Sequence, residues 1–191
     1  MTCVVGVAVP GHGCVLAADS LGLGDAGAFL IETQGKLFTP SSRLAVGFTR
    51  SYREGQIMRY LMEWPPKPQE GTDVTSWIVR EVVGKLRETL KEHGALEKGE
   101  RGADQGAWLI LAVRDRVFEI APDFQVTESA AGYVSLGSGY RYALGAMAVQ
   151  LGGRTAATLS EAESFARSAI GATEAHNTFV RSPITCVRTM A

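Results

Sequence analysis

The feature that most constrains this chain is its opening stretch, CVVGVAVPGHGCVLAAD, which covers residues 3–19. Two apolar runs rich in β-branched residues, 3–9 and 14–18, flank a PGHG turn. Buried strands joined through Pro and Gly have this pattern, so the sequence predicts a β-hairpin at the start of the chain. Thr2 stands at the head of the first run and Asp19 ends the second, so both polar residues border this hairpin.

The rest of the sequence predicts runs of strands followed by runs of helices. We expect extended segments at 29–38, 43–48, 107–113, 116–121, 124–137 and 182–190, and loops at 20–28 and 95–106. We expect helices at 51–64, 72–94, 140–153 and 160–176. Capping-box pairs open two of these helices, Ser51 with Glu54 and Ser160 with Glu163. This order favours an α+β class over an alternating parallel fold, and two helix pairs with two sheets suggest four layers.

Composition and charge exclude several classes of protein. A length of 191 residues without a linker predicts one domain, residues 1–191. With 19 Lys and Arg against 20 Asp and Glu, the chain has no basic stripe, which argues against nucleic acid as a partner. No apolar run is long enough to span a membrane, and the start lacks the features of a signal peptide.

Cysteines and histidines show no ligand pattern. The three cysteines have no CxxC spacing, which argues against a disulfide framework or a zinc site, and the three histidines share no ligand spacing. No metal site is expected, and together these features favour a cytoplasmic protein.

Thr2 becomes the N-terminal residue if Met1 is removed. A threonine hydroxyl is a poor nucleophile that needs a base, and an N-terminal threonine supplies one in its own α-amine, whose pKa is about 8 in model peptides. A lysine would lower the pKa of that amine, a carboxylate would orient the lysine, and a backbone N–H would stabilise an oxyanion. Asp19, Lys36 and Gly47, which stand at the ends of expected strands, are the candidates.

Five motifs in order resemble the proteasome β-type subunits of the N-terminal nucleophile hydrolase superfamily, with the simpler bacterial HslV-type peptidases as the nearer likeness. The motifs are TCVVGV, LAADS, QGKLF, AVGF and LGSGYRYALGAM. The resemblance runs from Thr2 to the last strand. It implies a four-layer αββα sandwich, in which two antiparallel sheets lie between helix pairs.

The resemblance also implies a set of site residues. Thr2 would be the nucleophile, Lys36 and Asp19 would tune proton transfer, and the Gly47 N–H would hold the oxyanion. Ser138 and Asn177 match further catalytic positions, and Gln34, Ala45 and Thr49 would wall a moderately open substrate pocket. No metal or organic cofactor is implied.

The same resemblance implies partners and leaves alternatives open. Members work as homo-oligomeric rings that cleave unfolded protein or peptide, often with an ATP-dependent unfoldase. Two positions depart from the family, because Asn177 and Val180 stand where an Asp and a Ser are usual, and Glu174 or Ser182 would be the compensating residues. The alternatives are a catalytically silent structural ring subunit and a small-molecule amidase of the same superfamily.

Overall fold

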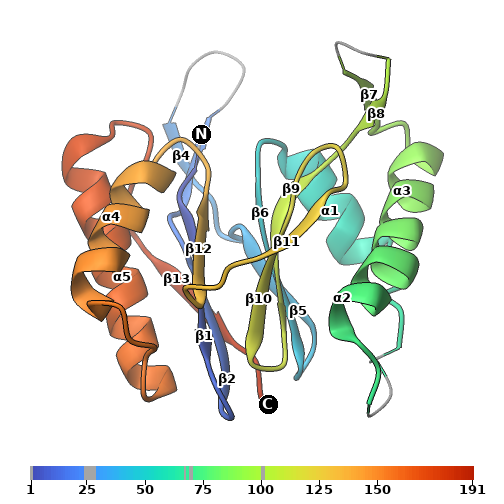
Figure 1. The fold of residues 1–191 in the computed structure, drawn as a ribbon. Helices are drawn as coiled ribbons and strands as arrows, with labels where there is room; N and C mark the ends of the chain where they lie inside the picture. Colours follow the sequence, from blue (N-terminus) through green and yellow to red (C-terminus); the bar gives the residue numbers. More distant parts are fainter. Residues whose placement is uncertain (1, 24–28, 67, 69–70, 100–101) are drawn as a thin grey trace.

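The structure is a computed structural model of residues 1–191, and it describes all of them except 1, 24–28, 67, 69–70 and 100–101. Two antiparallel sheets lie face to face between two groups of helices, as Figure 1 shows. This arrangement confirms the predicted α+β class and the four αββα layers.

The first sheet is built around the N-terminal hairpin. Its strands run in the order β12-β1-β2-β13, and every neighbouring pair is antiparallel. The bounds are β1 Val4–Val9, β2 Gly13–Ala18, β12 Tyr133–Leu136 and β13 Thr185–Arg188. All residues of β1 and β2 are buried, because helices cover one face of this sheet and the second sheet covers the other.

The second sheet has five antiparallel strands in the order β11-β10-β9-β6-β5. The bounds are β5 Leu37–Ser41, β6 Leu44–Thr49, β9 Trp108–Val113, β10 Arg116–Ile120 and β11 Val126–Glu128. The predicted strand 124–137 is therefore two strands, β11 and β12, that belong to different sheets. Gly132 lies between them with φ 74°, which turns the chain from one sheet to the other.

Helices cover the outer faces of both sheets. The second sheet carries α1 Tyr52–Tyr60, α2 Val74–Trp77, a π-helical turn Ile78–Val82 and α3 Val83–Glu92. The first sheet carries α4 Tyr140–Leu151 and α5 Leu159–His176. Separate apolar clusters fill the space between each helix layer and its sheet, and a third fills the space between the sheets.

Several predicted boundaries are wrong. The first helix ends at Tyr60 rather than at residue 64. The helix predicted at 160–176 begins at Leu159, and its N-cap is Thr158, whose side chain accepts a hydrogen bond from Glu161 N, rather than Ser160. The last strand is confined to Thr185–Arg188.

Both predicted loops contain short ribbons. In the segment 20–28, residues Leu21–Leu23 form β3, which pairs with β4 Phe29–Ile31, and residues 24–28 lie outside the described residues. The segment 95–106 holds β7 Glu97–Lys98 and β8 Asp104–Gln105. Within the described part of the chain, no helix is long and apolar enough to cross a membrane.

Candidate active site

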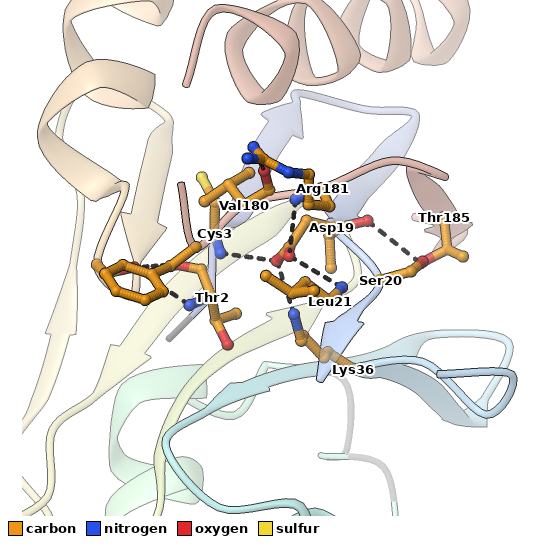
Figure 2. Close-up of polar contacts among 12 residues, drawn as sticks. Thr2, Cys3, Asp19, Ser20, Leu21, Lys36, Val180, Arg181 and Thr185 are labelled. Carbon is orange, nitrogen blue, oxygen red and sulfur yellow. Dashed lines mark hydrogen bonds and ion pairs between the residues drawn. The ribbon is translucent and has the colours of Figure 1, made fainter. Parts of the chain in front are cut away.

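The N-terminal hairpin brings Thr2 and Asp19 to the same end of the first sheet (Figure 2). Val4 pairs with Ala18, so the residues just outside this pair meet beyond it: Cys3 N donates to Asp19 Oδ1 at 2.9 Å, and Asp19 N donates to Cys3 O at 3.2 Å. Thr2 is 3% exposed and Asp19 is fully buried. Met1 lies outside the described residues, so its removal stays a prediction.

Lys36 reaches this end of the hairpin from the second sheet. It immediately precedes β5, and its Nζ donates to Asp19 Oδ1 at 2.8 Å. Both side chains are buried, at 1% and 0% exposure. Burial lowers the pKa of Lys36, because the charged ammonium has lost its water, and the Asp19 carboxylate opposes this shift.

Asp19 is held by four donors. Besides Cys3 N and Lys36 Nζ, which share Oδ1, its Oδ2 accepts from Leu21 N at 3.1 Å and from Arg181 N at 3.4 Å. Figure 2 shows these bonds converging on the carboxylate from Cys3 and Leu21 on either side of the hairpin, from Lys36 and from Arg181. Hydrogen bonds from backbone N–H groups stabilise a buried carboxylate, so Asp19 is a fixed anchor for Lys36.

Ser138 lies beside Thr2, in the turn between β12 and α4. Thr2 N donates to Ser138 Oγ at 3.3 Å, and Gly139 N donates to Thr2 O at 3.3 Å. Gly137 has a φ of 95°, and a Cβ there would overlap the Thr2 carbonyl oxygen, which explains why this turn needs glycine. The predicted GSG motif therefore wraps around the Thr2 backbone.

A small pocket of about 60 Å³ opens beside these residues, and we call it the Thr2 pocket. Its walls are Thr2, Lys36 and residues 48–52. Thr49 is thus one of the residues that line the Thr2 pocket, and its role in substrate binding stays a prediction. Gln34 instead lines a neighbouring void, and Ala45 is fully buried between the two sheets, so its side chain reaches neither space. Phe48 and Tyr52 line the Thr2 pocket, whereas Gln34 and Ala45, which we expected there, do not.

Gly47 does not line the Thr2 pocket. It lies inside β6 with strands on both sides, in register with Leu37 and Ile110. A Cβ at Gly47 would come within 2.7 Å of Val4 Cγ1 and 2.9 Å of Leu37 Cδ2, so the glycine lets the two sheets approach. The prediction of Gly47 as an oxyanion donor therefore lacks the required geometry.

Arg50 occupies the wall that Gly47 was expected to provide. It follows the last paired residue of β6, Thr49, so the sheet does not use its N–H. Its φ is 75°, a strained value for a non-glycine residue, and Ser51 N donates across it to Thr49 O at 3.1 Å. Strained backbone of this kind is concentrated at functional sites. Sequence reasoning missed Arg50, because no residue preference marks a left-handed arginine.

Asn177 is not among the residues that donate hydrogen bonds to Asp19. It caps the C-terminus of α5, and its Oδ1 accepts from Phe179 N at 2.9 Å, so its amide closes the turn that follows the helix. Val180 is fully buried against the helix layer.

The two residues expected to compensate bind each other instead of the site. Ser182 N and Oγ donate to Glu174 Oε1 and Oε2 at 3.1 and 2.7 Å. The segment after α5 contributes to the site through the backbone N–H of Arg181, which sequence patterns do not reveal.

Cys3 lies next to Thr2 but points away from the pocket. It is fully buried, its Sγ lies within 4.0 Å of Ser135 Oγ and Thr173 Oγ1, and burial raises the pKa of its thiol to about 11. A thiol in this state is not a nucleophile at neutral pH. The described residues include no group of three or more His, Cys, Asp or Glu side chains placed to hold a metal ion.

By sequence, no protein family and no curated protein matches the chain. Solved structures do match it. BPH, a bacterial proteasome homologue from Thiobacillus denitrificans, is 23% identical with a TM-score of 0.77, over 98% of this chain and 97% of BPH. The same protein in complex with epoxomicin is 22% identical with a TM-score of 0.74, over 98% of both chains.

A eukaryotic protein also has a similar structure, with lower sequence identity and a lower TM-score. HslV from Trypanosoma brucei is 18% identical with a TM-score of 0.65, over 99% of both chains. At these identities the likeness establishes the architecture: the chain has the fold of the proteasome-type N-terminal nucleophile hydrolases.

Proposed function

We propose that the chain is a subunit of a threonine peptidase in which Thr2, freed by removal of Met1, is the nucleophile. The observation that carries the proposal is that Thr2 and Lys36 line one pocket, while Lys36 Nζ is held 2.8 Å from Oδ1 of the buried Asp19. A further observation supports a base-assisted hydroxyl: Thr2 N donates to Ser138 Oγ at 3.3 Å.

The reaction follows from these positions. The Thr2 Oγ1 attacks a peptide carbonyl carbon, and the α-amine of Thr2 takes the hydroxyl proton. The C–N bond then breaks, the proton passes to the leaving amine, and an ester to Thr2 remains. Water hydrolyses that ester and restores the hydroxyl. Lys36, fixed by Asp19, stabilises the developing charge and tunes the amine.

The oxyanion donor in this proposal is the N–H of Arg50 rather than that of Gly47. Arg50 lines the Thr2 pocket, and its N–H lies beyond the last ladder pair of β6. The guanidinium of Arg50 forms an exposed ion pair with Glu97 at 3.4 Å. Solvent screens this pair, so the guanidinium adds only weak positive charge near the pocket. Backbone N–H groups fixed before the reaction are the usual donors for this role.

The proposal extends to assembly and substrate. The subunit forms a homo-oligomeric ring in the cytoplasm. Its substrates are unfolded proteins or peptides, and an ATP-dependent unfoldase supplies the unfolded chains. Support for the assembly comes from the solved neighbours, one of which is described as a helical assembly of the Anbu complex from Pseudomonas aeruginosa, with a TM-score of 0.69. Native mass spectrometry tests the oligomeric state directly.

One observation favours the rival reading, a silent ring subunit: Asn177 and Val180 serve the turn and the core instead of the Thr2 cluster. The test is therefore intact mass together with hydrolysis of a pool of blocked fluorogenic peptides. We expect a mass lower by one methionine residue, hydrolysis by the wild type, its loss in Thr2→Ala and its partial retention in Thr2→Ser.

Two outcomes contradict the peptidase. Full retention of Met1 in the native protein blocks the α-amine, and equal hydrolysis by wild type and Thr2→Ala shows that another group, or a contaminant, performs the reaction. Cleavage of simple amides with no cleavage of peptides supports the small-molecule amidase instead.

A further inference from the structure

Two small voids lie next to each other at the end of β6, and aromatic side chains stand between them. The first is the Thr2 pocket, of about 60 Å³. The second, of about 70 Å³, is lined by Glu32, Gln34 and Arg59 among others. Phe48 and Tyr52 line both voids, so this aromatic pair forms their common wall.

The wall is fixed by packing. The two rings meet edge to face, with centroids 5.9 Å apart and an interplanar angle of 88°. Phe48 is 4% exposed and belongs to the core under α1. A Cβ at Gly55 of α1 would overlap the Phe48 ring, so that glycine makes the space in which the ring lies. Side chains packed to this density do not swing aside for a substrate without a cost in stability.

The volume of the Thr2 pocket limits what can enter it. A cavity of about 150 Å³ holds one benzene molecule, whereas about 10–15 Å³ measured in the same way is enough for one water molecule. The Thr2 pocket, at about 60 Å³, is therefore too small for a phenyl ring and has room for a methyl or hydroxymethyl group. The combined volume of the two voids approaches that of the benzene-sized cavity only when the aromatic wall between them is removed.

The charge of the Thr2 pocket adds a second limit. The residues that line it include Lys36 and Arg50 and no carboxylate, so a lysine or arginine side chain of a substrate would find no opposite charge there. Burying a like charge next to a desolvated ammonium is unfavourable.

We propose that the Phe48–Tyr52 pair sets the specificity of the site, by admitting only a small, uncharged side chain, that of Gly, Ala or Ser, on the residue whose carbonyl Thr2 attacks. This inference rests on the proposed peptidase function. It assigns Phe48 and Tyr52 as specificity-determining residues. A substrate side chain could enter the second void only if one of the two rings were removed.

The experiment uses one series of blocked fluorogenic peptides that differ only in the residue before the cleaved bond: Ala, Leu, Phe or Arg. For the wild type we expect kcat/KM for Ala to exceed that for Leu, Phe and Arg by at least tenfold. In Phe48→Leu and in Tyr52→Ala, which remove one ring each, we expect the ratio of Leu to Ala to rise by at least tenfold. Arg should stay a poor substrate in both variants.

A matched control separates specificity from damage to the core. Phe118 is a fully buried phenylalanine of β10 in the same apolar cluster, and it lines neither void. Phe118→Leu should lower stability like Phe48→Leu and leave the ratio of Leu to Ala unchanged. Circular dichroism identifies any variant that has lost its fold, and the second ring variant then carries the test.

The outcomes distinguish the two proposals. If the wild type cleaves Leu or Phe peptides as well as Ala peptides, or if ring removal leaves the ratio unchanged, the specificity inference is overturned while the peptidase stands. If no peptide of the series is cleaved by a protein that has lost Met1, both proposals are overturned.

Discussion

Separate replacement of Asp19 by Asn and of Lys36 by Met should destabilise the protein unequally. Asp19→Asn leaves a buried ammonium without its carboxylate, and removal of one partner of a buried pair costs about 3–5 kcal/mol. Lys36→Met leaves the Asp19 carboxylate with three backbone donors, at 2.9, 3.1 and 3.4 Å. This second change removes one charged hydrogen bond, so we expect it to cost about 1.5–3 kcal/mol.

The assay is urea denaturation at pH 7, followed by tryptophan fluorescence and circular dichroism, for both single variants and the double variant. The double variant should be less destabilised than the sum of the singles by at least about 1 kcal/mol, because neither change then leaves an unpaired charge. Lys98→Met is the control: its pair with Asp104, at 2.6 Å, is exposed, so its loss should leave the free energy of unfolding almost unchanged. Equal costs for the singles, or strict additivity, would refute the reasoning.

Other predictions concern single residues near the site and at a helix end. Glu54 is 7% exposed, and burial raises the pKa of its carboxyl from 4.5 to about 7, with Arg50 opposing. The stability from its bound proton is complete below pH 4.5 and is lost as pH rises through 7. Glu54→Gln should therefore abolish a fall of about 3 kcal/mol in unfolding free energy between pH 4.5 and 8, measured by urea denaturation. Gly47→Ala should cost about 1–3 kcal/mol by overpacking the space between the sheets, and equal stability would contradict that account. Arg50→Gly should relieve strain and raise the melting temperature, and peptide hydrolysis should persist because the backbone N–H is retained. Loss of hydrolysis would instead assign the role to the guanidinium. Thr158→Ala should cost about 1 kcal/mol in denaturation, whereas Ser160→Ala should cost much less.

The sequence predicted the elements that depend on local pattern. The β-branched runs around PGHG form the hairpin of β1 and β2, and the short turn Arg114-Asp115 joins β9 to β10. The placement of Thr2, Asp19 and Lys36 together followed from the resemblance, and the structure brings those three residues together. Their chemical roles stay predictions.

At some positions the same local sequence pattern fits two structural interpretations, and the sequence alone could not distinguish them. TLSEAE contains two overlapping capping boxes, and packing of α5 on the first sheet selects Thr158 over Ser160. Gly47 fits an oxyanion turn and an intersheet contact equally well, and only the register of β6 decides between them. The left-handed backbone of Arg50 depends on tertiary structure, so no composition rule reveals it.

The hydrogen bond from Arg181 N to Asp19 Oδ2 joins residues 162 positions apart. Two further contacts tie the same regions, because Ser20 N donates to Arg181 O at 3.1 Å and Ser20 Oγ donates to Pro183 O at 2.6 Å. Arg181 is added by the ribosome 162 residues after Asp19. The anchor of the hairpin that carries Thr2 is therefore complete only after Arg181 has been synthesised, and a shorter nascent chain lacks this hydrogen bond.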